Sequence, residues 1–193
     1  PENIPASLKA LKQWCVWKYE ARATGKPAKH PYQPNGKSAK ANDSATWSTF
    51  DACLQVYQRG GYAGLGVFMR GTLAGVDLDH CRDGDVATPD AAEILGKFAG
   101  TYCEISPSGA GYRCFCYGEP AHSGKRGFVE VYATPSWRFL SVTGHALAAG
   151  VGHQDDHGVL ALHLFEGNGL MQAHARAQAG HVNDAQVAVH QQV

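Results

Sequence analysis

Asp77 and Asp79 lie two residues apart at the end of an apolar run, and this spacing constrains the fold more than any other feature. Residues 75–79 read Gly-Val-Asp-Leu-Asp. Because side chains alternate along a strand, Val76 and Leu78 are expected in the core. The two aspartates then share the other face, with Cα atoms about 6.5–7 Å apart. A divalent cation with a preference for oxygen ligands would relieve their repulsion. The alternative is two solvated aspartates on an exposed strand, where aspartate is uncommon.

Glu130 repeats this pattern, because it lies between Val129 and Val131. Both valines are expected in the core, which places the Glu130 carboxylate on the opposite face of its strand. If the two strands are neighbours, three carboxylates converge. They could then hold two Mg²⁺ or Mn²⁺ ions about 3.5–4 Å apart, as in phosphoryl or nucleotidyl transfer. The sequence shows the alternation in each segment and does not show that the strands are adjacent.

A glycine-containing segment lies between the acidic segments. Residues 106–113 read Ser-Pro-Ser-Gly-Ala-Gly-Tyr-Arg, and two glycines allow the backbone to approach a phosphate closely. Arg113 alternates with its apolar neighbours, so we expect its side chain on the carboxylate side, where it could bind phosphate. We also expect Arg113→Ala to weaken nucleotide binding more than folding. A plain glycine hairpin is the alternative.

Charge is unevenly distributed although the net charge is zero. Residues 22–40 contain five basic residues and no acid, whereas residues 77–93 contain six acids and one arginine. This asymmetry suits a protein that holds a metal on one side and phosphates on the other. Two solvated loops of opposite sign are the alternative.

The pattern of helices and strands indicates an α+β fold. Helices are expected over residues 4–11, 48–58, 89–100 and 155–165. Strands are expected over residues 14–19, 64–69, 73–79, 102–106, 112–117, 128–132 and 138–143. Residues 70–72 are expected to join two of these strands in a hairpin, residues 21–46 to form a long basic loop, and residues from 167 onward to form a linker or marginal helix.

The 193 residues suit one domain with an appendage, which we place at residues 1–150 and 151–193, the latter as a helical extension and linker. No apolar run approaches the roughly 20 residues that a membrane span needs, so we expect no membrane association. The six cysteines form no C-x-x-C pair and are expected to be reduced and partly buried, which favours a cytoplasmic location.

An ordered set of motifs connects these segments. Residues 14–19, the Lys/Pro loop, Thr-Trp-Ser at 46–48, Asp-Leu-Asp at 77–79, Ser-Pro-Ser-Gly-x-Gly at 106–111, Val-Glu-Val-Tyr at 129–132 and residues 138–145 follow in this order. Over residues 4–148 this set resembles the bifunctional primase-polymerase branch of the archaeo-eukaryotic primase superfamily. Its members occur in phages, plasmids and integrated elements, often fused to a helicase.

The resemblance implies an RRM-like mixed or antiparallel sheet with flanking helices, plus a small N-terminal α/β unit. It also implies metal-dependent nucleotidyl transfer with Mg²⁺ or Mn²⁺. Asp77 and Asp79 match the family's D-x-D motif, and Glu130 matches its third carboxylate. Arg113 falls where many members place a histidine that contacts nucleotide phosphates, which is a departure from the family pattern.

The resemblance also implies partners: a single-stranded DNA template with its primer, a dNTP or NTP, and a helicase domain or subunit. Further candidate nucleotide contacts are Ser108, Arg138, His145 and Lys29, and candidate template contacts are Lys37, Lys40, Trp47 and Tyr32. Two alternatives remain open from the sequence. One is a degenerate primase-like domain that binds nucleic acid or nucleotide without turnover, and the other is a metal-dependent nuclease.

Overall fold

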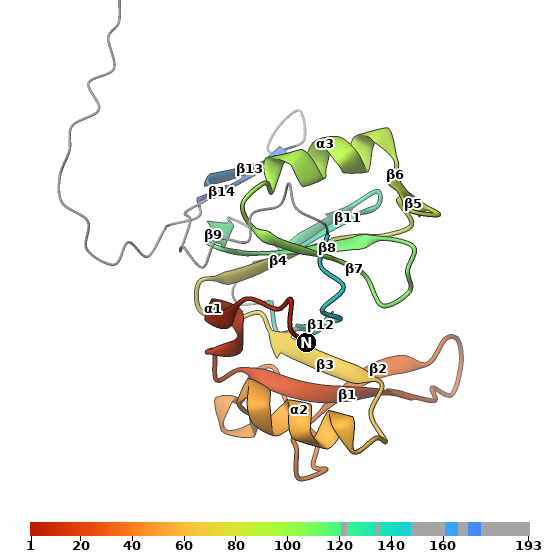
Figure 1. The fold of residues 1–193 in the computed structure, drawn as a ribbon, viewed down its shortest axis with the longest axis vertical. Coiled ribbons are helices and arrows are strands. Elements are labelled where there is room, and N and C mark those ends of the chain that lie inside the picture. Colours follow the sequence, from red (N-terminus) through yellow and green to blue (C-terminus); the bar gives the residue numbers. More distant parts are fainter. Residues whose placement is uncertain (121–122, 134–135, 148–160, 166–169, 175–193) are drawn as a thin grey trace, which may run out of the picture.

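A computed structural model describes residues 1–120, 123–133, 136–147, 161–165 and 170–174. Two antiparallel sheets form the body of the protein, and a helix covers the outer side of each (Figure 1). This arrangement confirms the α+β class. None of the described helices is long and apolar enough to cross a membrane.

The first sheet has four strands in the order β12-β3-β1-β2. Its strands are β1 (Trp14–Glu20), β2 (Ala28–Tyr32), β3 (Gly64–Phe68) and β12 (Phe139–Val142). Helix α2 (Phe50–Gln58) packs on this sheet, and the Thr49 side chain caps the helix by accepting a hydrogen bond from the Ala52 amide. Helix α1 (Ala6–Lys9) is shorter than expected.

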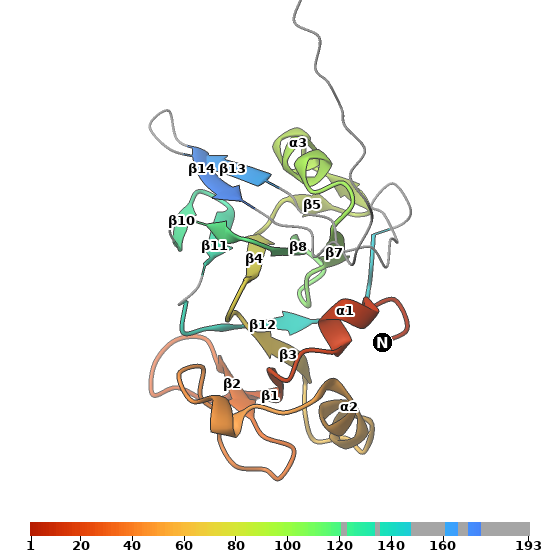
Figure 2. The ribbon, with the colours of Figure 1, turned by 90° about the vertical axis from the view of Figure 1, so that its left-hand side faces the viewer.

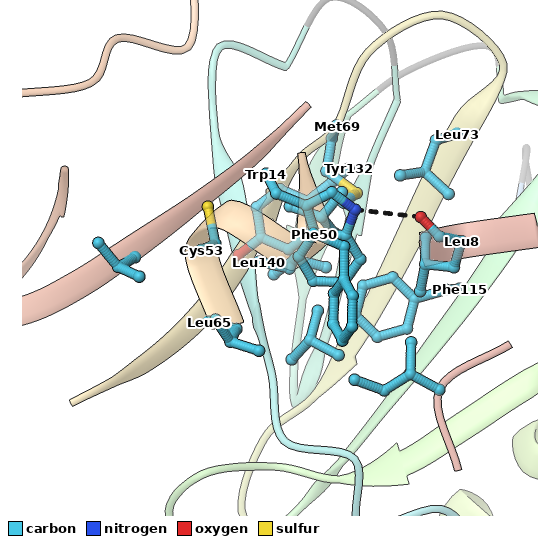
Figure 3. Close-up of a cluster of buried hydrophobic side chains, with 14 residues drawn as sticks. Leu8, Trp14, Phe50, Cys53, Leu65, Met69, Leu73, Phe115, Tyr132 and Leu140 are labelled. Atoms are coloured by element: carbon cyan, nitrogen blue, oxygen red, sulfur yellow. Dashed lines mark hydrogen bonds between the residues drawn. The ribbon is translucent and has the colours of Figure 1, made fainter. Parts of the chain in front are cut away.

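The core of this half is built around aromatic side chains. Trp14 is fully buried and meets the ring of Phe50 edge to face, with ring centroids 4.9 Å apart. Its indole nitrogen donates a hydrogen bond of 3.1 Å to the Leu8 carbonyl, so the buried N–H of the large ring has a partner (Figure 3). These contacts join α1 and α2 to β1.

The second sheet has five strands in the order β10-β11-β4-β8-β7. Its strands are β4 (Leu73–Leu78), β7 (Tyr102–Ile105), β8 (Tyr112–Tyr117), β10 (Gly124–Arg126) and β11 (Val129–Tyr132). Helix α3 (Pro89–Lys97), capped by Thr88, lies on the outer face. Val76 and Leu78 pack there against Ile94 and Phe98, which confirms the predicted core face of β4.

The prediction that β3 and β4 form a hairpin is wrong. β3 pairs with β1 and β12, whereas β4 pairs with β8 and β11, so residues 70–72 carry the chain from one sheet to the other. Every residue of both strands is buried. Each strand is therefore central in its own sheet, with both edges already paired, and has no edge left for the other.

The loop expected over residues 21–46 is also corrected, because β2 lies within it. This strand pairs with β1 from Val16↔Tyr32 to Glu20↔Ala28. Backbone pairing along β1 satisfies the polar groups of this segment. A short helix η1 (Ser44–Thr46) follows before α2 begins.

Short strands complete the fold: β5 (Arg82–Asp83), β6 (Val86–Ala87), β9 (Glu119–Pro120), β13 (Ala161–Phe165) and β14 (Leu170–His174). The sequence predicts a helix over residues 155–165 and a linker or marginal helix from residue 167. The structure instead has the strands β13 and β14 in these regions, and the two strands pair with each other. Leu162 and Leu164 have the two-residue spacing of a strand, which competes with helix formation. Residues 155–160 and 175–193 lie outside the described part of the chain.

The two sheets meet at β12. Figure 2 shows that β12 lies on the side of the first sheet nearest to β4 and β8. Side chains of β7 and β8 reach across this junction to β12 and the residues after it. The second sheet thus turns its acidic face toward β12.

Candidate active site

A row of charged residues crosses the second sheet. Each member lies directly opposite the next on the neighbouring strand, in the order Lys125, Glu130, Asp77, Arg113 and Glu104. Residues directly opposite in a sheet share a face and their side chains interact. Asp77 and Glu130 are therefore neighbours on one face, as the strand alternation required, with a cation on each side of the pair.

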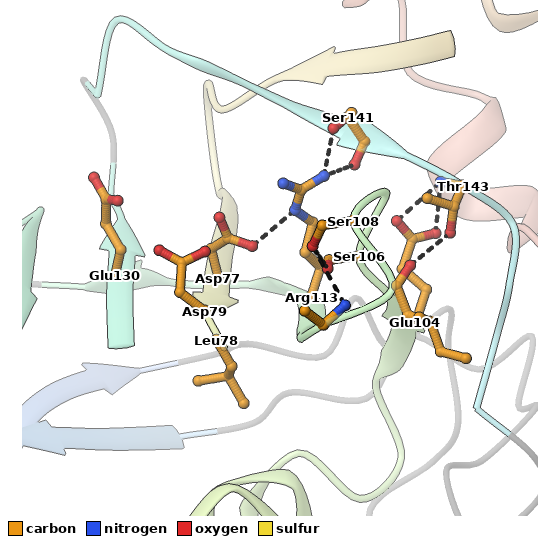
Figure 4. Close-up of polar contacts among 12 residues, drawn as sticks. Asp77, Leu78, Asp79, Glu104, Ser106, Ser108, Arg113, Glu130, Ser141 and Thr143 are labelled. Carbon is orange, nitrogen blue, oxygen red and sulfur yellow. Dashed lines mark hydrogen bonds and ion pairs between the residues drawn. The ribbon is translucent and has the colours of Figure 1, made fainter. Parts of the chain in front are cut away.

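Arg113 is buried and bound on two sides. Its Nε donates to Asp77 Oδ1 at 2.9 Å, and its Nη1 donates to the Ser141 carbonyl at 2.8 Å and also to the Ser141 hydroxyl (Figure 4). The side chain points to the carboxylate side, which confirms the predicted direction. Arg113 also ties β4 and β8 to β12, because Ser141 belongs to β12.

The other two carboxylates are also paired with cations. Lys125 Nζ lies 2.6 Å from Asp79 Oδ2 and 3.8 Å from Glu130 Oε2. Arg138 Nη1 lies 3.6 Å from the other oxygen of Glu130. Every carboxylate of the predicted site thus has a positively charged partner.

These pairs determine how far the carboxylates converge. Within the residues that the structure describes, no three His, Cys, Asp or Glu side chains come close enough together to hold a metal ion. The shared face of Asp77, Asp79 and Glu130 is as expected, but their oxygens turn toward Arg113, Lys125 and Arg138 in this conformation. The three remain the residues that could hold a divalent cation, because they offer the oxygen ligands that Mg²⁺ and Mn²⁺ prefer.

A cavity of about 450 Å³ opens beside this row. Lys29, Arg113 and Arg138 line it, together with Asp77. Most of the remaining lining comes from Ser141 and from the aromatic residues Phe68, Tyr132, Trp137 and Phe139. The cavity therefore combines three cations, a carboxylate and flat apolar surface, a lining that suits an anionic ligand with an aromatic part.

Lys29 reaches the cavity from β2. Its Nζ donates a hydrogen bond of 3.2 Å to the Ser141 hydroxyl and lies 4.8 Å from the centre of the Trp17 ring. Burial, and secondarily the positive charge of Arg113, lower the pKa of Lys29 to about 8. Lys29 is therefore still mostly charged at neutral pH and loses its proton more readily than an ordinary lysine.

Ser108 and His145 do not line the cavity. Ser108 is exposed in the loop between β7 and β8, where its hydroxyl lies 3.0 Å from that of Ser106. Gly111 of this loop serves the fold, because a Cβ at this position would lie 2.0 Å from the Leu78 carbonyl oxygen. His145 is exposed, and its carbonyl accepts a hydrogen bond from the Ile105 amide.

Of the four candidate template contacts, two are aromatic residues that pack within the fold and two are exposed lysines. Trp47 stacks on Phe68 with ring centroids 5.4 Å apart and donates its indole N–H to the Lys40 carbonyl at 2.8 Å, so it stabilises the loop before α2. Tyr32 packs near Tyr62 within the first half of the fold. Lys37 and Lys40 are exposed.

Glu104 is a buried member of the row that sequence reasoning missed. Both of its carboxylate oxygens accept from the Thr143 amide at 2.9 Å, and Oε2 also accepts from the Gly144 amide at 3.0 Å and the Tyr102 hydroxyl at 2.8 Å. Burial raises the pKa of Glu104. An acid within the apolar run Tyr-Cys-Glu-Ile is the signal that marks it in the sequence.

Lys125 and Trp137 were missed as well. Trp137 is 54% exposed at the cavity, in the left-handed backbone region with φ of 50°, and the Arg70 guanidinium lies 4.5 Å from the centre of its ring. Nothing in the local sequence distinguishes either residue from an ordinary surface side chain, because Lys125 owes its place to strand pairing and Trp137 to the path of the chain just before β12.

Comparison with known proteins gives evidence on the class of protein. No family model matches the chain. Over 156 residues the chain is 34% identical to a protein named DNA primase-polymerase from Nitratiruptor phage NrS-1. The similarity covers 74% of this chain but only 21% of the phage protein, so it concerns one part of a much longer relative. It supports the primase-polymerase class that the motifs indicated.

Proposed function

We propose that this chain is a primase-polymerase catalytic domain that performs metal-dependent nucleotidyl transfer in the replication of a phage, plasmid or integrated element. The observation that carries the proposal is the register that sets Glu130 opposite Asp77. This register places two acids next to each other, and one of them, Asp77, lines the cationic cavity. The second sheet with α3 would be the RRM-like part of such a domain, and the first sheet with α2 its N-terminal α/β unit.

The acidic residues have the chemistry of a site for Mg²⁺ or Mn²⁺. Asp77 lies on the central strand β4, Asp79 directly follows this strand, and Glu130 lies opposite Asp77 on the neighbouring strand β11. Lys125 Nζ already lies between Asp79 and Glu130, so this position accommodates a positive charge. Two bound ions would activate the primer 3′-hydroxyl and neutralise the triphosphate. The protein contributes the rigid backbone that holds the carboxylates in place.

The cationic residues would bind the incoming nucleotide. Lys29, Arg113 and Arg138 reach the cavity from three different strands or their ends, β2, β8 and the start of β12. Charge-assisted hydrogen bonds from such groups position a triphosphate and stabilise charge that develops during transfer. A dNTP or NTP would place its phosphates against these side chains, and a primed single-stranded DNA template would approach from the open side.

A primer-extension assay tests the proposal. The chain is incubated with a primed template, dNTPs and Mn²⁺, and the length of the labelled primer is followed with time. Extension supports the proposal, and shortening of the strand would instead indicate a nuclease. We further propose that a helicase, fused or separate, acts together with this domain, as the resemblance implies.

A degenerate binding domain is the second candidate, and the buried ion pair between Arg113 and Asp77 favours it. An arginine bound this firmly to a metal-binding carboxylate opposes metal binding by that carboxylate. Nucleotide or DNA binding without extension, at any Mn²⁺ concentration, would support this candidate over the catalytic one.

A further inference from the structure

Lys125 lies among the carboxylates that would hold the cation of the proposed site. Its Nζ is 2.6 Å from Asp79 Oδ2 and 3.8 Å from Glu130 Oε2, and the residue lies opposite Glu130 in the strand register. One ammonium therefore neutralises two of the three carboxylates. The third, Asp77, is neutralised by Arg113.

The two cations differ in how firmly the fold holds them. Arg113 is buried and also bonded to Ser141 on β12, so its guanidinium is fixed between two sheets. Lys125 lies on β10 at the edge of the second sheet, every residue of that strand is exposed, and the Lys125 side chain is 49% exposed. A flexible, half-exposed side chain can move into solvent at little cost, because water solvates its ammonium.

We propose that Lys125 is a built-in counter-ion that occupies the cation position of the metal-free protein and is displaced when a divalent metal binds. The inference rests on the proposed function, since it takes Asp79 and Glu130 as metal ligands. Without a cation, neighbouring carboxylates would repel one another. Lys125 relieves that repulsion, and a divalent ion, with twice the charge, competes with it for the same oxygens.

The competition has a measurable consequence for metal affinity. Metal binding must break the ion pairs of Lys125, so removing the ammonium should tighten binding. For a partly exposed ion pair we expect a change of about two- to fivefold. Lys125→Met keeps the length and apolar stem of the side chain and removes the charge.

Lys97 provides a matched control. It forms an ion pair of 2.9 Å with Glu93 on α3, and its side chain is 41% exposed, close to the 49% of Lys125. Helix α3 covers the opposite face of the sheet from the acidic row, as the packing of Val76 and Leu78 on it shows. Lys97→Met therefore removes one positive charge and one surface ion pair without touching the site.

The first experiment is a titration with Mn²⁺ in the absence of nucleotide, with free Mn²⁺ followed by electron paramagnetic resonance. Wild type, Lys125→Met and Lys97→Met are compared, and a melting curve of each variant confirms folding. We expect tighter binding for Lys125→Met alone. Equal affinity for the wild type and Lys125→Met would overturn the inference.

The second experiment follows Lys125 in the wild-type protein. Amines are acylated with and without saturating Mn²⁺, and the modification of each lysine is measured by mass spectrometry. Displacement from Asp79 should increase the labelling rate of Lys125 and leave that of Lys97 unchanged. Unchanged or slower labelling of Lys125 at saturation would contradict displacement.

These measurements separate failure of the inference from failure of the proposed function. If neither the wild type nor Lys125→Met binds Mn²⁺, the metal site is absent, and both the proposed function and the displacement are overturned. If both proteins bind Mn²⁺ equally and Lys125 labelling does not respond, the metal site stands and only the role of Lys125 is overturned. Binding that appears only in Lys125→Met would support the inference strongly.

Discussion

Glu130 lies directly opposite Asp77 across the pair of strands β11 and β4. Directly opposed residues have Cβ atoms about 4.5–5.5 Å apart, and two acids in such a pair destabilise a sheet. Lys125, Arg138 and Arg113 compensate this repulsion from the two sides. The sheet opposes two acids and surrounds them with cations, and the lining of the nearby cationic cavity suits an anionic ligand.

Replacing Glu130 with glutamine should remove primer extension and leave the fold intact. The change deletes one proposed metal-binding carboxylate, and losing one such electrostatic contact typically lowers a rate about 10²–10³-fold. The measurement is primer extension with Mn²⁺. Asp83→Asn is the control, because Asp83 is an exposed acid on β5. Extension by Glu130→Gln at the rate of Asp83→Asn would exclude Glu130 from the reaction.

Arg113→Ala should lower the free energy of unfolding substantially. Removing one partner of a buried ion pair leaves an uncompensated charge on Asp77, which costs about 3–5 kcal/mol. The burial seen here thus revises the expectation that this variant affects binding more than folding. Urea denaturation provides the measurement, with the exposed Arg22→Ala as the control. An unchanged midpoint would show that the ion pair is dispensable for folding.

Nucleotide affinity should fall as the pH rises from 7.5 to 9.5. The pKa of Lys29 is lowered to about 8, so the side chain is charged at the lower pH and largely neutral at the higher one. Losing a charge-assisted phosphate contact should cost about tenfold in affinity. Calorimetric titration with a dNTP measures it. Lys29→Arg keeps its charge over this range and should not show the fall; a parallel fall in both proteins would assign the pH dependence to another group.

Glu104→Gln should destabilise the protein by about 1–3 kcal/mol, the cost of leaving a buried donor without a partner. Both carboxylate oxygens accept the Thr143 N–H, and Oε2 also accepts the Gly144 N–H. The glutamine oxygen can replace only one of these acceptors, and its NH₂ at the other position faces the Thr143 N–H donor to donor. Chemical denaturation measures the change. Glu93→Gln, an exposed acid in a surface ion pair, is the control and should have little effect. Equal stability of the two variants would show that Glu104 does not hold the end of β12.

The alternation of apolar and charged side chains along single strands was predictable from the sequence. The apolar positions of β4 do face α3, and Arg113 does point to the carboxylate side. Helix α3 also begins at Pro89, where it was expected to begin. These features depend on local spacing and backbone chemistry, which a single segment contains in full.

The pairing of strands was decided only by the tertiary structure. The short connection at residues 70–72 suggested a hairpin, yet β3 and β4 belong to different sheets. Likewise, only the order β10-β11-β4-β8-β7 brings Lys125, Glu130 and Asp77 into one row. The sequence by itself determined which face of β4, β8 and β11 carries charge. It did not determine which strands are neighbours, because that choice depends on which arrangement satisfies the backbone edges and buries the apolar faces of the whole chain together.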